Sequence, residues 1–222
     1  SHRGDAVILT TGGKAAPGQG VTGMGYALAK GFGHEYTPLY PALVPIRCSH
    51  GALKGLKGIR VQCGAVLLEG EKTVAREVGE VQFTDYGLSG IPAMQLSCCL
   101  GTLRGRGERT VAIDFFPEMG EEDLRAMLMQ RAAERAEETL ETLFLGSIHK
   151  RVLYAVMKDV GLAPLSRTGG ELQPRDIDRL AAALKHWRLR VEGTLSWEHA
   201  QVTGGGISLT EINDCFESRC QR

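Results

Sequence analysis

The chain has 222 residues with 26 basic (Lys and Arg) and 26 acidic (Asp and Glu) side chains, so its formal net charge is zero and predicts no nucleic-acid footprint. Its 43% hydrophobic and 23% charged content excludes a globally disordered chain. With no apolar run long enough to span a membrane and no signal peptide before the first strand, we expect a cytoplasmic protein without a membrane partner.

The first expected element is a buried strand over residues 6–11, which are apolar and are followed by glycine. A helix then covers residues 23–32, with Thr22 as its cap and Gly33 in the C′ position. Three prolines between residues 36 and 46 predict an extended connector, because proline excludes a helix and a central strand.

Strand signals dominate residues 59–116. Residues 61–68 and 77–83 alternate in part and flank a turn at Gly70, while a further strand over residues 110–116 ends at Pro117. Several short strands at this spacing predict a small antiparallel barrel or sandwich.

The pattern becomes helical at residue 121. One apolar stripe runs over residues 121–144, a second ends at Gly161, and a third helix begins with Pro174 at its N1 position. Residues 189–195 and 199–203 return to strand character. The three helices are therefore predicted to form a subdomain inserted into the β-domain.

A glycine pair follows the first strand directly, in the segment Thr11, Gly12, Gly13 and Lys14. Glycine there would let the backbone approach a ligand, and an ordinary turn is the simpler alternative, which local chemistry favours. Residues 18–23 match G-x-G-x-x-G, but they do not follow the strand at once. We do not read them as a dinucleotide fingerprint.

A second dense segment carries Asp85, Tyr86 and Ser89 on one glycine-punctuated loop. A carboxylate, a phenol and a hydroxyl in one loop are typical of a wall facing a substrate or cofactor. The alternative is a turn into a helix capped near Ser89, with Pro92 in its first turn.

Three successive glycines follow the last strand, among them Gly204 and Gly205. They indicate a close approach to a cofactor or to another backbone, and a flexible turn is the alternative. The six cysteines include no C-x-x-C pair and no zinc spacing, so we expect reduced thiols and no metal.

Taken together and in order, these segments resemble the HI0933-like flavoproteins, a family of NAD(P)/FAD-dependent oxidoreductases. The resemblance rests on residues 8–14, 17, 20–26, 33–34, 40–45, 83–90, 113–114 and 202–207, followed by Glu211 and residues 217–218. It implies that the chain is the middle of a longer protein, because the family's opening G-x-G-x-x-G and its closing FAD segment are missing.

The domains implied are a remnant of an FAD-binding domain (1–40), a β-barrel-like domain (41–118 and 189–209), a helical insert (119–188) and a return segment (210–222). The fold class is α+β: a small antiparallel β-barrel-like domain with an inserted helical subdomain, plus a remnant strand and helix of an FAD-binding domain.

The function implied is FAD-dependent reduction of an unsaturated substrate, a small molecule or an RNA base, with NAD(P)H as reductant. The expected cofactor contacts are Thr11, Gly12, Gly13, Lys14, Gly204 and Gly205. The catalytic candidates are Asp85, Tyr86 and Ser89. This chain alone is expected to be inactive and to bind FAD weakly or not at all, since its ADP site is missing. The rival hypothesis is a non-catalytic module that binds a substrate or a partner.

Overall fold

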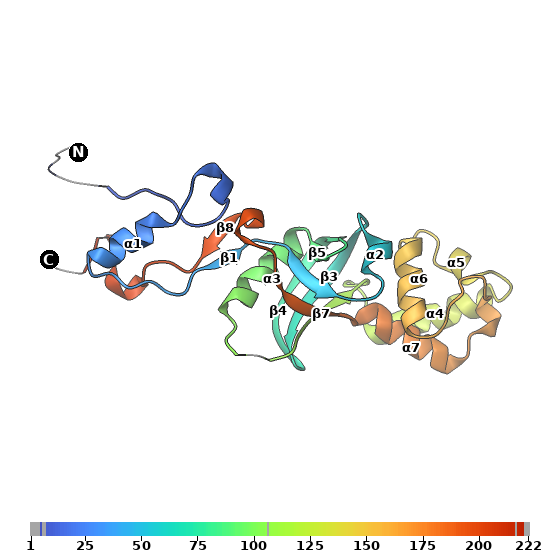
Figure 1. Ribbon diagram of the computed structural model, residues 1–222. Coiled ribbons are helices and arrows are strands. Elements are labelled where there is room, and N and C mark those ends of the chain that lie inside the picture. Colours follow the sequence, from blue (N-terminus) through green and yellow to red (C-terminus); the bar gives the residue numbers. More distant parts are fainter. Residues whose placement is uncertain (1–4, 6–7, 106, 216, 220–222) are drawn as a thin grey trace.

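The computed structural model describes residues 5, 8–105, 107–215 and 217–219. A central barrel separates two smaller parts (Figure 1). One holds both ends of the chain, and the other holds the helices between the last two barrel strands. Within the described residues, no helix is both long and apolar enough to cross a membrane.

Six antiparallel strands close the barrel in the order β2-β5-β4-β3-β6-β7. Their bounds are β2 Ile46–Ser49, β3 Arg60–Glu69, β4 Lys72–Phe83, β5 Gly87–Ser89, β6 Arg109–Asp114 and β7 Trp187–Thr194. Alternation along β3 turns Cys63, Ala65 and Leu67 inward, and all three are fully buried. The barrel and the α+β fold class are therefore confirmed.

Two helices cover the barrel. Helix α3 (Ile91–Thr102) packs on β4 with Leu96 and Ser97 fully buried, and the short α2 (Leu53–Leu56) precedes β3. Gly90 is the N-cap of α3, with φ of 92°. A side chain there would meet the backbone of β4, so this position needs glycine.

The helical insert comprises α4 (Glu121–Glu134), α5 (Leu140–Leu143), α6 (Lys150–Asp159), the 3-10 turn η2 (Gly169–Glu171) and α7 (Pro174–Lys185). The apolar stripe predicted over residues 121–144 does not form one helix. Arg135 leaves helical geometry after α4, and Thr139 caps α5 by accepting the Thr142 amide at 3.4 Å. A local cap therefore interrupts a periodicity that continues in the sequence.

The terminal part contains α1 (Met24–Gly31), the paired strands β1 (Tyr40–Ala42) and β8 (Val202–Gly204), and the 3-10 turns η1 (Pro17–Gln19), η3 (Trp197–His199) and η4 (Leu209–Glu211). Gly33 occupies the C′ position of α1 with φ of 90°, as predicted. The N-cap is Gly23, and Thr22 assists by accepting the Met24 amide at 3.3 Å.

The first predicted strand is not formed over residues 8–11, the part of it that the structure describes. Ile8 and Leu9 are 87% and 43% exposed. A strand needs a hydrogen-bonded neighbour, and no described segment pairs with these residues. Conversely, the predicted connector contains β1, whose Pro41 is tolerated because the sheet with β8 has only two strands.

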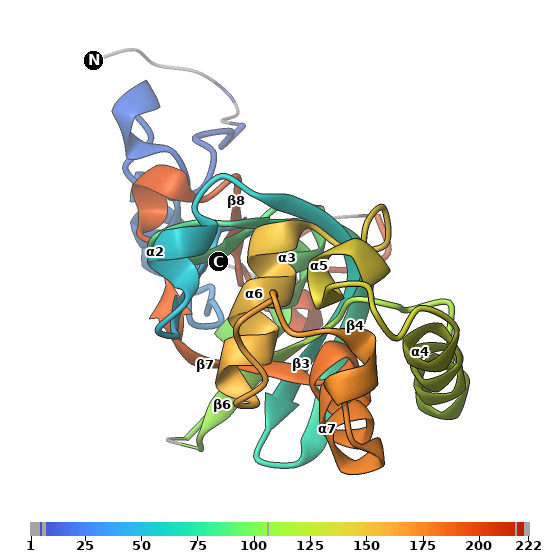
Figure 2. The ribbon, with the colours of Figure 1, turned by 90° about the vertical axis from the view of Figure 1, so that its right-hand side faces the viewer.

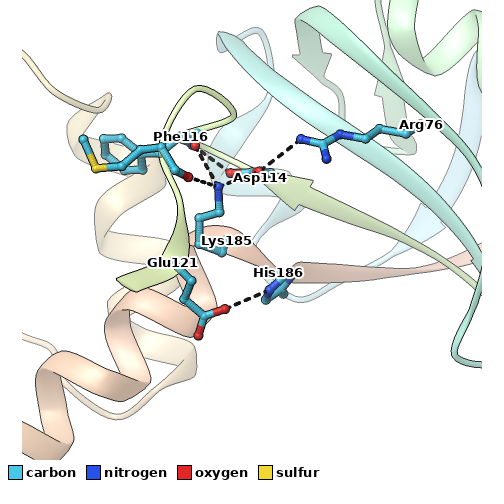
Figure 3. A network of polar contacts seen from close by, with 7 residues as sticks. Arg76, Asp114, Phe116, Glu121, Lys185 and His186 are labelled. Carbon is cyan, nitrogen blue, oxygen red and sulfur yellow. Dashed lines mark hydrogen bonds and ion pairs between the residues drawn. The ribbon is translucent and has the colours of Figure 1, made fainter. Parts of the chain in front are cut away.

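A buried ion pair joins the barrel to the insert (Figure 3). The Lys185 ammonium, at the end of α7, lies 2.8 Å from Asp114 Oδ2 at the end of β6. The same ammonium donates to the Phe116 and Met119 carbonyls at 2.8 and 2.5 Å. Asp114 Oδ1 accepts the Phe116 amide at 3.0 Å. Both charges are thus paired and hydrogen-bonded, as buried charges must be.

Candidate functional site

The two predicted cofactor segments meet through one hydroxyl. Thr203 Oγ1 accepts the amides of Lys14 at 2.7 Å and Ala15 at 3.0 Å, which joins positions 189 and 188 residues apart. The first glycine loop (residues 11–14) therefore lies against β8 at Thr203, the residue that precedes Gly204 and Gly205 in the chain. Sequence reasoning missed Thr203, although its place directly before three glycines was a signal.

Three of the glycines are required by contacts inside the chain. A Cβ on Gly13 would strike the Thr203 hydroxyl, and one on Gly204 would strike the Tyr40 ring. Gly205, with φ of 78°, lies against the Pro38 carbonyl. Gly205 thus makes the close approach to another backbone that the three glycines indicate, and the approach to a cofactor stays a prediction.

Gly12 differs from those three glycines. Its φ is 69°, it is exposed, and a Cβ would meet only Val21 at 3.7 Å. Within the described part of the chain, the amides of Gly12 and Gly13 have no hydrogen-bond acceptor. Unpaired amide donors at and after a left-handed glycine suit an anionic or carbonyl-bearing ligand.

Lys14 is held beside an aromatic ring. Its ammonium lies 5.2 Å from the centroid of the Trp197 ring, within cation–π range. The neighbouring Ala16 amide donates to the Trp197 carbonyl at 3.1 Å, which fixes the loop against η3. Trp197 is a second residue of this site that the sequence patterns did not single out.

A polar network joins the residues that follow α1 to the return segment (210–222). His34 Nδ1 and Glu211 Oε2 are 2.9 Å apart, and the Glu35 amide donates to the same carboxylate. Ser218 Oγ lies 2.9 Å from His34 Nε2. The return segment is thereby tied to the end of α1, so Glu211 has a clear structural partner.

The catalytic candidates lie elsewhere on the barrel. The Asp85 carboxylate accepts a hydrogen bond of 2.6 Å from Lys57, which directly follows α2. Tyr86 is 36% exposed, and its carbonyl accepts the Cys48 amide at 2.9 Å. Ser89 ends β5 and lies opposite Gln82 of β4. Figure 1 shows α2 at the end of the barrel that faces the helices, away from α1 and β8.

The electrostatics of Asp85 limit its chemistry. The hydrogen bond from the Lys57 ammonium holds the pKa of the Asp85 carboxyl below its usual value, and the same contact raises the pKa of Lys57. Asp85 is therefore an ionised acceptor at neutral pH and not a proton donor. It lines a cavity of about 650 Å³ with Cys48, Ser49, His50, Gly51, Leu53 and Lys54.

His50, on the edge of that cavity, is fully engaged. Its Nδ1 accepts the Ala52 amide at 3.2 Å, so Nε2 carries the hydrogen that faces Asp159 Oδ2 at 3.1 Å. The same Asp159 oxygen accepts the Trp187 indole N–H at 2.7 Å. Nε2 joins the barrel to α6, while Nδ1 fixes the local turn through Ala52, so both ring nitrogens of His50 have structural partners.

Comparison with known proteins supplies a family and several relatives. Residues 40–202 match the family model described as the HI0933-like protein barrel and H2TH domain. A 3-dehydro-bile acid delta(4,6)-reductase from Clostridium scindens is 33% identical over 97% of this chain and 53% of its own length. Ribosomal RNA dihydrouridine synthases are 28% identical in Escherichia coli, over 94% of this chain and 50% of theirs, and 25% identical in Haemophilus influenzae, over 93% and 49%. The chain thus spans about half the length of the curated relatives it matches.

Proposed function

Because the chain belongs to the family of HI0933-like proteins, we propose that it is the central, substrate-side region of a FAD-dependent oxidoreductase that reduces an unsaturated substrate. The relatives are named as a reductase of a 3-dehydro-bile acid and as synthases of dihydrouridine in ribosomal RNA. We assign to this protein the reduction of a carbon–carbon double bond, with NAD(P)H as the reductant.

The contact of Thr203 with residues 14 and 15 carries this proposal. It holds the first glycine loop beside Gly204 and Gly205 at the end of β8, although the two segments lie near opposite ends of the chain. This glycine surface suits a flat, polar-edged cofactor better than two separate turns would. The internal packing of Gly13, Gly204 and Gly205 then serves to bring the backbone into place.

The residues of the first glycine loop (residues 11–14) fit one edge of an FAD molecule. Gly12 and Gly13 offer free backbone N–H groups, and Lys14 supplies a positive charge beside Trp197. We propose that Thr11 and these three residues hold the cofactor, with Gly204 and Gly205 shaping the adjoining wall. Bound FAD would supply hydride transfer between NAD(P)H and the substrate.

On the substrate side, we assign the proton-donating role to Tyr86. Its side chain is partly exposed, and the neighbouring Asp85 is held ionised by Lys57. Ser89 is proposed to position the same loop from β5. Asp85 is tied to the end of α2 by Lys57, and we propose that this loop meets the glycine surface through substrate or through parts of the longer protein.

The terminal part supports a larger FAD-binding domain. Met24 and Leu28 of α1 and Phe32, its C-cap, are spaced four residues apart and are 60%, 44% and 68% exposed. A helix of a folded domain normally buries such a face. We propose that further strands of the FAD-binding domain cover it in the complete protein, and that this chain alone is inactive. The free thiols described favour a cytoplasmic location.

The test compares the complete protein with two variants at position 203. The complete protein is expected to purify with stoichiometric flavin, seen in its visible absorbance, and to oxidise NAD(P)H when an unsaturated ring substrate is added. Thr203→Val should lower flavin occupancy, and Thr203→Ser, which keeps the hydroxyl, should retain it. A complete protein that neither purifies with flavin nor takes it up would refute the proposal.

The second candidate is a non-catalytic binding module. The observation that favours it is the size of the cavities on the helical side of the barrel, away from the glycine surface. On that view, the complete protein would bind ligand without consuming NAD(P)H, and the same assay separates the two candidates.

A further inference from the structure

A cavity of about 700 Å³ lies where the barrel meets the helical insert. It is formed by two stretches far apart in sequence, residues 51–56 around α2 and residues 141–165 around α6. Figures 1 and 2 both place α2 beside α6, on the side of the barrel away from α1 and β8. The proposed reduction uses none of the residues that line it.

The floor of this cavity is apolar. Leu56, Ala155 and Leu165 are only 1%, 6% and 6% exposed, and Ala52 lies beside them. The volume falls within the roughly 300–1,000 Å³ typical of small-molecule sites. The floor would therefore accept an apolar body of several rings.

One wall comes from the exposed face of α6. Arg151, Tyr154 and Lys158 share that face because they are three and four residues apart on the helix. Tyr154 is 46% exposed, so its ring can flank a ligand without leaving its place on the helix. The wall thus combines the aromatic ring of Tyr154 with the positive charges of Arg151 and Lys158.

The charge of the wall is not balanced inside the protein. Lys150 and Glu141 neutralise each other at 2.6 Å. Arg151 donates to the Gly55 carbonyl at 3.2 Å, which anchors α6 to α2 without cancelling its charge. Within the described parts of the chain, neither Arg151 nor Lys158 forms an ion pair. Two uncompensated cations therefore stand over an apolar floor in a chain whose net charge is zero.

We infer that this cavity binds a small organic anion: an apolar ring system with one carboxylate, sulfonate or phosphate at its edge. The ring body would cover the floor beside Tyr154, and the anionic group would reach Lys158 and Arg151. A nucleic-acid strand is a poorer match. Its charges repeat along a polymer, whereas these two cations border one closed apolar hollow.

The probe is 8-anilinonaphthalene-1-sulfonate, an aromatic dye with a single sulfonate, titrated against the 222-residue chain and followed by fluorescence. N-phenyl-1-naphthylamine, which has the same rings without the charge, is the matched ligand control. The sulfonate dye is expected to bind at least threefold more tightly than the neutral one, and inorganic phosphate at equal ionic strength should not displace it.

Two variants address the cavity. Lys158→Gln removes one cation and is expected to weaken binding of the sulfonate dye about threefold to fivefold, with little effect on the neutral dye. Gly55→Leu fills the hollow and is expected to weaken both dyes at least tenfold. The Gly55 position tolerates a side chain because a Cβ there meets nothing within 4 Å.

Two control variants locate the dye. Lys72→Gln removes a cation at the start of β4, outside the cavity, and should change nothing. Leu28→Gln alters the exposed face of α1, where an apolar dye could also bind. All four variants should keep the circular-dichroism spectrum and unfolding temperature of the parent chain.

The inference is overturned if Lys158→Gln and Gly55→Leu leave dye binding unchanged, or if Lys72→Gln weakens it equally. Loss of binding in Leu28→Gln alone would place the dye on α1 and would also overturn it. Displacement of the dye by a single-stranded RNA oligonucleotide at lower concentration than by unlabelled aromatic sulfonate would reassign the site to nucleic acid. None of these outcomes bears on flavin in the complete protein.

Discussion

Lys185 and Asp114 approach each other to 2.8 Å across the boundary between α7 and β6, with both side chains 9% exposed. Arg76 approaches the same carboxylate only to 3.6 Å and is itself half exposed. The ammonium of Lys185 is therefore the main compensation for a carboxylate that has left water. The backbone carbonyls of residues 116 and 119 complete the shell around that ammonium.

Lys185→Met should destabilise the chain strongly. It leaves the Asp114 carboxylate buried with a distant partner, a situation that costs about 3–5 kcal/mol. Urea unfolding followed by circular dichroism measures the change. The matched control is Arg188→Gln, which breaks a surface pair with Glu71 and should leave the midpoint nearly unchanged. Equal effects from the two variants would contradict the importance of burial.

Gly87→Ala should weaken the closure of the barrel. Gly87 has φ of 147°, and a Cβ there would collide with the backbone of Ile46 and Cys48 on β2. Moving two strands apart costs about 1–3 kcal/mol. Gly51→Ala is the control, because a Cβ at that position meets nothing within 4 Å. Similar unfolding midpoints for both variants would show that β2 moves away from the added Cβ at little cost in stability.

The buried thiols of Cys48 and Cys63 should react with an alkylating reagent far more slowly than the exposed thiol of Cys215. Burial raises the pKa of Cys48 and of Cys63 to about 12, so neither forms a thiolate near pH 8. Cys215 is exposed. Iodoacetamide labelling read by mass spectrometry should modify Cys215 first, and Cys48 and Cys63 only after unfolding in urea. Fast labelling of Cys63 in the folded chain would mean that the barrel opens.

Asp85 should titrate below its ordinary value of 3.8, because its carboxylate accepts a hydrogen bond from Lys57. A carboxyl whose folded pKa is depressed adds stability above its unfolded pKa and loses that contribution as pH falls through the folded pKa. Carboxyl NMR titration of the parent and of Lys57→Gln measures this, and the variant should return Asp85 toward 3.8. An Asp85 midpoint that is the same in the parent and in Lys57→Gln would contradict the hydrogen bond between the two side chains.

The barrel was predictable because its signal is local. Alternation along β3 and a glycine turn at position 70 determine which residues face inward, whatever the rest of the chain does. The start of α7 at Pro174 and the C′ glycines after α1 and α6 are local signals of the same kind, and each lies where the sequence indicated.

The missed features depend on partners far away in sequence. Residues 8–11 have the composition of a strand, but no described segment forms backbone hydrogen bonds with them as a neighbouring strand. The break before α5 follows from a cap at Thr139, while the apolar spacing continues across it. Thr203 acquires its role only when folding brings it to Lys14. For the cofactor and catalytic residues, the sequence predictions await the flavin and activity measurements proposed above.

The pairing of β6 with β7 has an architectural consequence. Ile113 lies opposite Trp187, so the whole helical insert leaves and re-enters the barrel between two adjacent, hydrogen-bonded positions. Topologically, it occupies the place of an ordinary hairpin turn. An insert of another length can be joined at these two positions without removing a hydrogen bond of the barrel, provided that it covers Trp187 and Phe115 and replaces the Lys185 ammonium beside Asp114. The insert can therefore change in sequence and length while the pairing of the six barrel strands stays the same.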